Sequence, residues 1–298
     1  MVGVALSIRT ADRTRFPART KIGDEEKTIE EPTMVFDWLT QRHRHTILTE
    51  PFPPEWSDIL ERNTPFYACL AADEQSRLHD LLRLFVAEKS WEGCGGLTLT
   101  DEIKVTIAAQ ACLLILNIDR GIYPNVESVL VYPSAFIARQ QSLSPDGGLE
   151  ETPYALLGEA WRTGPVIVSW ADAREGGTDP ADGHNVVYHE FAHKLDMRDG
   201  RADGVPRLVD EAEYETWARV MSSEYADLVK KAEHGQQTLL DPYGAANAGE
   251  FFAVATECFF EKSVRMRQSH PELYEVLSGF YRQNPAARDE DCSKHKVD

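Results

Sequence analysis

The sequence has few cysteines, and they show no regular spacing. Its 298 residues include Cys69, Cys94, Cys112, Cys258 and Cys292. An odd number without a Cys-x-x-Cys pair is not typical of a disulfide framework or of a cysteine zinc site. We therefore expect a fold held by a hydrophobic core, which a chain of this length can bury. Cys258 is expected to be a small buried hydrophobe and not a metal ligand.

Basic residues and long apolar runs are also scarce. The chain has 31 Lys and Arg against 49 Asp and Glu, a net charge of −18, and no basic cluster. This balance argues against direct binding of nucleic acid. No run approaches the ~18 apolar residues of a membrane helix, and the apolar start of the chain is too short and interrupted for a signal peptide. We expect a cytoplasmic protein without membrane association.

One stretch, Val186–Asp196, contains the pattern H-E-x-x-H. Residues four apart lie on one face of a helix, so His189 and His193 can direct their imidazoles at one ion. Zinc accepts such nitrogens and usually has four ligands. Glu190 follows the first histidine, where it can take a proton from water at the metal. The pattern predicts a catalytic zinc site.

The flanking residues indicate that this stretch is a helix. Val187, Phe191 and Leu195 repeat at i, i+4 and i+8 and form an apolar face. Thr178–Pro180 offers a cap followed by proline, and Gly200 is a stop signal. The alternative is a helix whose histidines face solvent or satisfy hydrogen bonds in the core. An acidic residue between paired histidines on an apolar helix has little packing rationale, which favours the metal site.

A catalytic zinc needs a third protein ligand and an open position. The metzincin pattern has a glycine and then a third histidine after the motif, but Asp196 and Asp199 stand at these positions, so that pattern is absent. We therefore expect a carboxylate from a later helix, predicted from Glu250 onward, where Glu250 and Glu257 lie seven residues apart on a mostly apolar face. Buried carboxylates are costly unless paired or metal-bound, which favours Glu250 as the ligand. Glu257 either orients a ligand imidazole or forms a structural ion pair.

These residues closely resemble the Mlc titration factor A family of bacterial zinc peptidases. The resemblance covers roughly residues 35–285. It rests on His189–Asp196, Gly249–Val254, Gly158–Trp161, Gly164–Trp170, Thr106–Cys112 and Tyr123–Val126. The site is also similar to that of the catalytic domain of the anthrax lethal factor peptidase.

The resemblance implies a gluzincin site with one zinc per chain. Zinc would be held by His189, His193 and Glu250, with Glu190 as general base. In both similar groups a tyrosine seven residues before the ligand glutamate is thought to assist catalysis, and Tyr243 stands there. Manganese or cobalt could substitute in a site of two imidazoles and one carboxylate.

The same resemblance implies aminopeptidase activity on short peptides. Such an enzyme needs acceptors for the α-ammonium of its substrate. Asp196 and Glu159 are possible acceptors, and each could equally cap or brace a helix. The alternative function is regulatory: the family name reflects binding of the glucose-responsive repressor Mlc, which relieves repression of sugar-uptake genes. The two roles are compatible.

We expect a single α+β domain at 34–284, with a helical part at about 34–95 and a catalytic part at about 96–284. An arm at 1–33 and a tail at 285–298 are expected to be flexible. The resemblance implies a predominantly helical, zincin-like fold. The predicted helices lie at 36–48, 72–90, 100–116, 211–231 and 272–283, and the strands at 129–132 and 165–170. The second strand could be an ordinary core strand, or an edge beside the active-site helix that pairs with the peptide backbone, as in the similar families.

Overall fold

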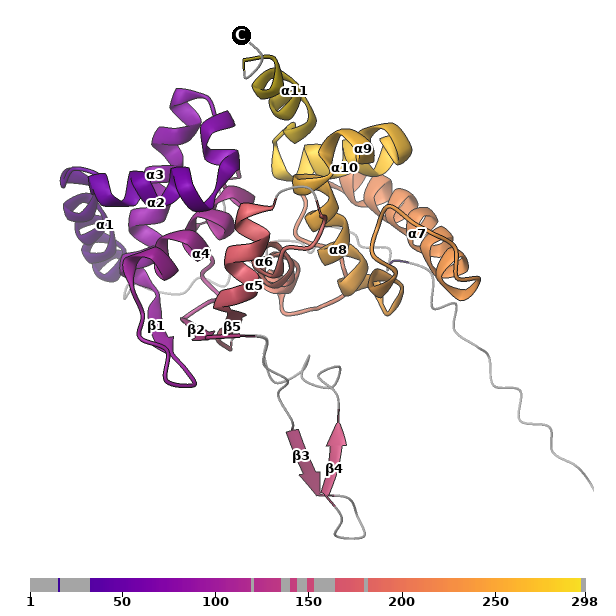
Figure 1. Ribbon diagram of the computed structural model, residues 1–298, viewed down its shortest axis with the longest axis horizontal. Helices are drawn as coiled ribbons and strands as arrows, with labels where there is room; N and C mark the ends of the chain where they lie inside the picture. The colour runs from indigo at the N-terminus through magenta and orange to yellow at the C-terminus, as the bar shows by residue number, and fades with distance from the viewer. Residues whose placement is uncertain are drawn as a thin grey trace, which may run out of the picture.

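The computed structural model describes residues 16, 33–118, 121–134, 140–143, 149–152, 164–179 and 182–295. Helices dominate these residues, and strands are few (Figure 1). The helices are α1 (Thr33–Thr49), α2 (Pro54–Asn63), α3 (Ala72–Glu88), α4 (Asp101–Leu114), α5 (Trp170–Thr178), α6 (Val186–Asp196), α7 (Glu211–Glu233), α8 (Ala248–Glu261), α9 (Ser263–Ser269), α10 (Pro271–Tyr281) and α11 (Pro285–His295). Short 3₁₀ turns are η1 (Pro65–Cys69), η3 (Met197–Asp199) and η4 (Pro242–Ala245). The predominantly helical α+β fold is confirmed.

The strands form a small parallel sheet and a separate hairpin. The sheet has the order β1-β2-β5, built from β1 (Ser90–Gly93), β2 (Ser128–Tyr132) and β5 (Val166–Ser169). In Figure 1 this sheet lies below α4, α5 and α6. β3 (Gln140–Leu143) pairs antiparallel with β4 (Leu149–Thr152). Among the described strands β5 pairs only with β2, so the predicted strand lies at an edge.

The metal-motif helix α6 is the centre of the packing. It contacts α4, α5, α8 and β5. Its predicted apolar face is buried, because Val187, Phe191 and Leu195 are each at most 1% exposed. Burial of three such side chains stabilises the helix position by roughly 1.5–3 kcal/mol each. The two histidines are therefore carried on a helix that cannot easily rotate.

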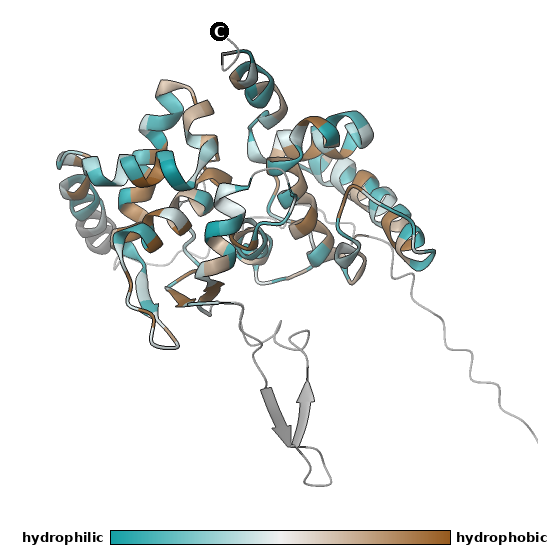
Figure 2. Cartoon of the chain, viewed as in Figure 1, coloured by the Kyte–Doolittle hydropathy of each residue, from teal (hydrophilic) through white to brown (hydrophobic). Residues whose placement is uncertain are grey.

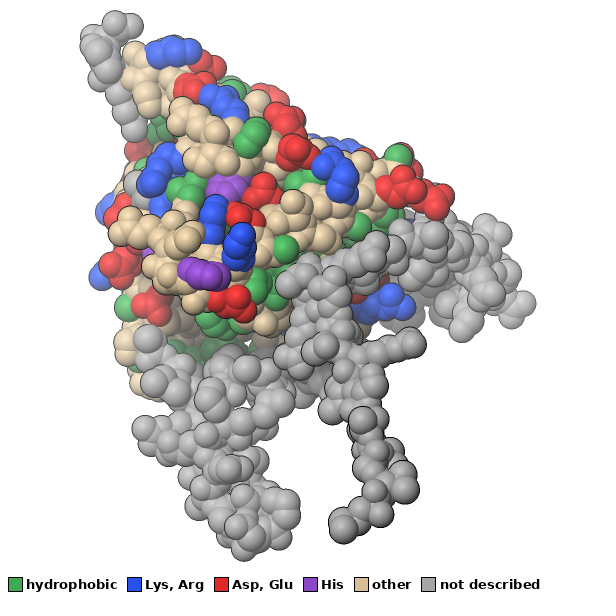
Figure 3. Space-filling model, turned by 90° about the vertical axis from the view of Figure 1, so that its right-hand side faces the viewer, with side chains coloured by type: hydrophobic (Ala, Val, Ile, Leu, Met, Phe, Trp, Pro, Cys, Tyr) green, Lys and Arg blue, Asp and Glu red, His purple; other side chains and the backbone are tan. Residues whose placement is uncertain are grey.

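Helix α8 is apolar along most of its length, whereas α11 is largely polar, as Figure 2 shows. Figure 3 shows acidic and basic side chains interspersed over one face of the molecule. No helix in the described part of the chain has the length and apolar character needed to cross a bilayer.

Most predicted elements are confirmed with small shifts in their bounds. Helix α7 buries every side chain predicted to face inward: Tyr214, Trp217, Val220, Met221, Tyr225 and Leu228. Cys258 is buried as a free thiol, as expected. The predicted polar loop at 142–149 is partly wrong, since its ends belong to β3 and β4.

Three predictions about the start of the metal helix and the end of the chain are wrong. Thr178 ends α5 and does not cap α6; the cap is Asn185. The tail is not flexible throughout, because residues 285–295 form α11. Cysteines do form a bridge, since Cys69 is joined to Cys292. Helix α11 also packs against α9 and η1, with an ion pair from Arg288 to Glu74 at 3.4 Å.

Most of the expected arm at 1–33 lies outside the described residues. Within it, Phe16 is 2% exposed and packs edge-on against Tyr225 and Phe251. Its backbone N–H donates to the hydroxyl of Ser222 at 2.9 Å. One residue of the amino-terminal segment is thus part of the core beside Glu250.

Candidate metal centre

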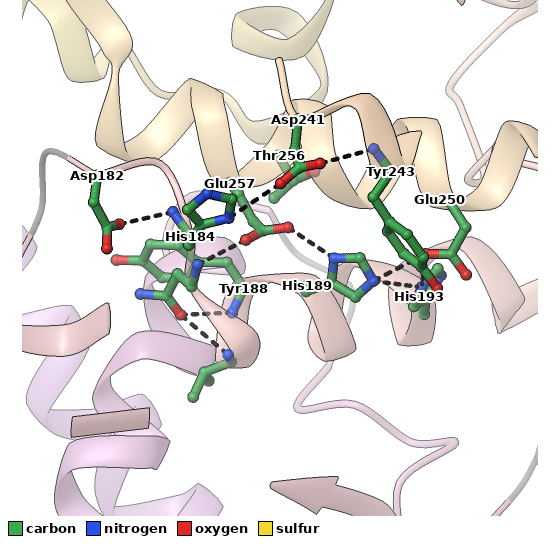
Figure 4. Close-up of polar contacts among 12 residues, drawn as sticks. Asp182, His184, Tyr188, His189, His193, Asp241, Tyr243, Glu250, Thr256 and Glu257 are labelled. Atoms are coloured by element: carbon green, nitrogen blue, oxygen red, sulfur yellow. Dashed lines mark hydrogen bonds and ion pairs between the residues drawn. The ribbon is translucent and has the colours of Figure 1, made fainter. Parts of the chain in front are cut away.

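Two helices bring three candidate ligand side chains together. His189 and His193 project from α6, and Glu250 projects from the first turn of α8 (Figure 4). The side chain of Asn247 accepts the backbone N–H of Glu250 at 3.0 Å and so caps α8. A carboxylate is favoured in this first turn by the helix dipole. Local helix-start chemistry therefore places Glu250 opposite the histidines.

The three ligand atoms form a nearly regular triangle. Nε2 of His189 lies 3.0 Å from Oε2 of Glu250 and 3.2 Å from Nε2 of His193. Nε2 of His193 lies 3.4 Å from the same carboxylate oxygen. Tetrahedral ligands at the usual zinc distances lie roughly 3.3–3.4 Å apart. The donor set and its spacing thus fit a small divalent cation with a fourth position left for water or substrate.

Glu257 orients the first histidine. Nδ1–H of His189 donates to Oε1 of Glu257 at 2.7 Å, which directs Nε2 towards Glu250. Oε2 of Glu257 accepts the backbone N–H of Asn185 at 2.6 Å. Of the two roles left open by the sequence, this geometry matches the orienting one. A carboxylate in this position holds the tautomer and increases the basicity of the ligand nitrogen.

Asn185 is a buried residue of the site that sequence analysis missed. Its side-chain oxygen accepts the N–H groups of Val187 and Tyr188 at 3.1 and 3.0 Å. Its amide donates to Gln110 on α4 at 2.8 Å. Asn185 thus caps α6 and ties it to α4 while its backbone meets Glu257. An asparagine directly before a helical apolar pattern is a start signal that could have identified it.

The proton balance of the site favours an ion pair when no metal is bound. Burial by itself would lower the pKa of His189, but hydrogen bonds to Glu250 and Glu257 raise this pKa to about 10. Burial would raise the pKa of Glu250, whereas its contacts with His189 and His193 lower this pKa to about 2. Because only a neutral imidazole binds metal, metal binding must release the proton of His189.

Glu190 and Tyr243 lie beside this triangle. Glu190 follows His189 on α6 and is partly exposed. Tyr243 lies on η4, is 58% exposed, and has its ring centroid 6.1 Å from that of His189. Burial raises the pKa of Tyr243, and the charges of Glu250 and Glu190 raise it further. The phenol is therefore a hydrogen-bond donor at neutral pH.

Of the two residues considered for binding the substrate ammonium, the structure describes only Asp196. Asp196 is fully buried, and its Oδ2 accepts the N–H of Gly204 at 2.8 Å. It braces the end of α6, which was the other interpretation. Glu159 lies outside the described residues.

With this site in place, comparison with known proteins gives the family. The family model for glucose-regulated metallo-peptidase M90 matches residues 38–282. This chain belongs to that family. The match spans all three candidate ligands, and α11 lies beyond it.

Related proteins are similar to this chain over most of their own length. An uncharacterized protein of Synechocystis is 43% identical over 246 residues, which are 82% of this chain and 89% of the relative. Mlc titration factor A of Escherichia fergusonii is 30% identical over 79% of this chain and 88% of its own. Mlc titration factor A of Salmonella arizonae is 31% identical over 78% and 92%. The resemblance to the Mlc titration factor A family is therefore confirmed, and the M90 protein is a metallopeptidase by family.

We expect Glu257→Gln to weaken metal binding. The amide keeps the shape of the side chain but loses the negative charge, which orients His189 and makes its Nε2 a better metal ligand. Loss of such an orienting partner typically weakens metal affinity by about 10–100-fold. Competition with a chromogenic chelator would measure the change. Glu261→Gln, one turn further along α8, is the matched control, and an unchanged dissociation constant in the Glu257 variant would contradict the orienting role.

Glu261 provides a pH-dependent test of the same helix. It is 9% exposed, and neither carboxyl oxygen has a hydrogen-bond partner of good geometry. Burial raises its pKa to about 8, and the nearby Asn185 side chain and Gly183 amide offset only part of the effect. A raised carboxyl pKa favours the protonated form in the fold. Its contribution to stability is complete below pH 4.5 and is lost as pH rises through about 8.

The unfolding free energy should fall between pH 5 and pH 8.5, and Glu261→Gln should reduce this fall by roughly 1–4 kcal/mol, at about 1.4 kcal/mol per pKa unit. Urea unfolding at both pH values measures the difference. Glu215→Gln, an exposed substitution on α7, should leave the decline as it is. Parallel pH profiles for the Glu261 variant and the parent would show that the buried carboxyl is not protonated.

Proposed function

We propose that this protein is a zinc-dependent aminopeptidase with one zinc per chain. The observation that carries the proposal is the triangle of His189, His193 and Glu250, whose ligand atoms lie 3.0–3.4 Å apart. Two imidazoles and one carboxylate with a free fourth position are typical of catalytic zinc. A structural zinc would normally have four protein ligands.

Bound zinc would supply Lewis acidity, lowering the pKa of water and polarising a peptide carbonyl. Glu190 would take a proton from the attacking water and pass it to the leaving amine. Tyr243 would donate a hydrogen bond to the carbonyl oxygen as charge develops there. Such a bond favours the transition state over the bound substrate.

Tyr243→Phe should therefore lower kcat by about 10²-fold, the lower range for loss of one oxyanion donor. Metal content should stay the same, because the phenol is not a ligand. Steady-state kinetics with a chromogenic substrate would measure the effect, with Tyr67→Phe on η1, whose hydroxyl contacts His79, as a control away from the triangle. If kcat is unchanged, Tyr243 has no part in catalysis.

We expect the backbone of the peptide substrate to bind along the edge of β5. β5 directly precedes α5, contacts α6, and lies at the end of the described sheet. An extended peptide could add to this edge through main-chain hydrogen bonds. Its scissile carbonyl would then lie along α6, where Glu190 and the metal act.

The test is metal analysis together with hydrolysis of a panel of aminoacyl chromogenic substrates. We expect one zinc per chain and activity that is lost on chelation and recovered with zinc. Amino-terminally acetylated peptides should be poor substrates of an aminopeptidase. Cleavage within acetylated peptides would instead assign an endopeptidase, and a zinc-loaded protein without hydrolysis would contradict a peptidase function.

A second candidate function comes from the relatives. Proteins named Mlc titration factor A share most of this chain. By analogy, this protein would bind a transcriptional repressor, using a surface separate from or overlapping the peptidase site. Titration of purified Mlc by calorimetry, with wild type and Glu190→Gln, tests it. Equal affinities would indicate separate surfaces, and no binding would remove this role.

We place the protein in the cytoplasm, where a repressor partner would act. The bridge between Cys69 and Cys292 bears directly on this proposal, because reducing compartments keep most thiols free. Counting free thiols in protein rapidly quenched from cells would test it. Five free thiols per chain would agree with a reducing location, and three would indicate that the bridge forms in the cell.

A further inference from the structure

Phe16 is the one described residue ahead of α1, and it lies inside the fold. Its side chain is buried, although the family match begins only at residue 38. Its ring packs edge-on against Tyr225 of α7 and Phe251 of α8, with centroids 6.0 Å apart in each pair. Its backbone N–H donates to the hydroxyl of Ser222 on α7. Helices α7 and α8 therefore hold both the side chain and the backbone of this residue.

A glycine makes room for the ring. Gly204 has a φ of +73°, a left-handed conformation that favours glycine, and a Cβ there would lie 2.7 Å from Cε1 of Phe16. The same Cβ would collide with the carbonyl of Ala248, the first residue of α8. The N–H of Gly204 donates to Asp196 at the end of α6. The ring of Phe16 thus lies where the segment after α6 meets the start of α8.

Phe16 supports the first turn of α8, which carries Glu250. Phe251, one of the two ring partners, directly follows Glu250 and is 0% exposed. The first N–H groups of a helix have no partner within the helix, so the position of this turn depends on its cap and its packing. Asn247 supplies the cap, and Phe16 supplies packing between α8 and α7. Loss of the ring would leave a cavity into which this turn can relax.

The same ring supports η4, which carries Tyr243. The hydroxyl of Tyr225, the other ring partner, donates to the carbonyl of Ala245 at the end of η4, at 3.2 Å. η4 also contacts both α7 and α8. Figure 4 shows the side chain of Tyr243 beside that of Glu250, close to the two histidines. A shift of Tyr225 towards the space left by Phe16 would therefore displace the phenol as well.

We propose that Phe16 is a positioning residue that holds Glu250 and Tyr243 in place beside the metal. The inference rests on the proposed peptidase function for the role of Tyr243, whereas the placement of Glu250 is tested by metal binding alone. Phe16 touches neither metal nor substrate and acts through Phe251 and Tyr225. The competing explanation is that its ring only fills space in the core and stabilises the fold.

Phe16→Ala in the full chain should weaken zinc binding by about 10-fold, the lower end of the usual effect of groups that hold a ligand in place. Competition with a chromogenic chelator measures the dissociation constant, and urea unfolding measures stability. Phe52→Ala is the control, because it removes a ring between α1 and α2 that stacks on His79 at 3.7 Å. Both variants should lose stability, but only the Phe16 variant should lose zinc affinity.

The rate gives a second readout that core filling would not change. In protein saturated with zinc, Phe16→Ala should lower kcat by about 10–100-fold with little change in KM, because a small displacement of a catalytic group can cost about 10²-fold. In the Tyr243→Phe background the same substitution should have little further effect, since the phenol that it displaces is already absent. Phe52→Ala should keep the wild-type kcat.

A folded Phe16→Ala protein with the zinc affinity of the wild type would overturn the inference. Additive losses of kcat in the double variant would also overturn it. If Phe16→Ala does not fold, Phe16→Leu decides, because it keeps much of the apolar volume but loses the ring contacts. It should lower zinc affinity and kcat in the same direction by smaller factors, and wild-type values for both would overturn the inference.

The zinc measurement separates this result from the peptidase proposal. A wild type that hydrolyses no peptide, together with weakened zinc binding in Phe16→Ala, would overturn the peptidase function and retain the positioning of Glu250. Peptide hydrolysis by the wild type, with equal zinc affinity and equal kcat in the Phe16 variant, would overturn the role of Phe16 and leave the peptidase function intact.

Discussion

Replacing Glu190 by Gln should reduce the rate of peptide hydrolysis by about 10²–10⁴-fold, the usual contribution of a positioned general base. Gln has nearly the same shape as Glu but cannot accept a proton from water. Glu190 lies next to His189 but is not part of the ligand triangle, so zinc content should remain at one per chain. Single-turnover kinetics and metal analysis of the same preparation would measure both quantities.

A variant that loses one carboxylate charge elsewhere in the chain is the matched control. Glu215→Gln lies on the exposed side of α7 and should retain full activity and zinc. Hydrolysis by the Glu190 variant at the wild-type rate would show that another group takes the proton. Loss of zinc along with activity would show instead that Glu190 supports the fold of the site.

The second large effect concerns the end of the chain. Cys292→Ser should lower the unfolding free energy of the oxidised protein by about 2–5 kcal/mol, since a bridge that closes a long loop restricts the unfolded chain most. The bridge from Cys69 to Cys292 spans 223 residues of sequence. Helix α11 should then separate from η1 first, because its remaining contacts are mostly polar.

Urea unfolding with and without dithiothreitol measures this difference. The wild type should lose the same free energy on reduction, and the Cys292 variant should not respond. Cys94→Ser, which removes a partly exposed free thiol, is the control and should behave as the wild type in both conditions. Equal unfolding curves for oxidised wild type and the Cys292 variant would mean that the bridge adds nothing to stability.

Interactions between near neighbours in the chain could be predicted well from sequence. The histidines four apart and the apolar face of α6 depend only on the period of a helix, which is a local property. The same holds for α7, whose inward side chains follow that period. A strand at 165–170 was also recognisable, because its apolar run is short and flanked by turn residues.

Helix boundaries were less predictable where two start signals competed. Thr178–Pro180 and Asn185 both precede α6, and only packing decides between them. Asn185 prevails because its amide also meets Gln110 and its backbone meets Glu257. Those partners lie 75 and 72 residues away, beyond the reach of any local pattern.

By itself, the sequence predicted the candidate metal site of this M90 protein, since His189, Glu190 and His193 lie in one short helical stretch and Glu250 in a second. Only the tertiary structure decided how that chemistry is held and what surrounds it. The hydrogen bond from His189 to Glu257 and the bridge from Cys69 to Cys292 each join segments far apart in the chain. Such contacts arise from packing of the whole core, which composition and periodicity do not encode.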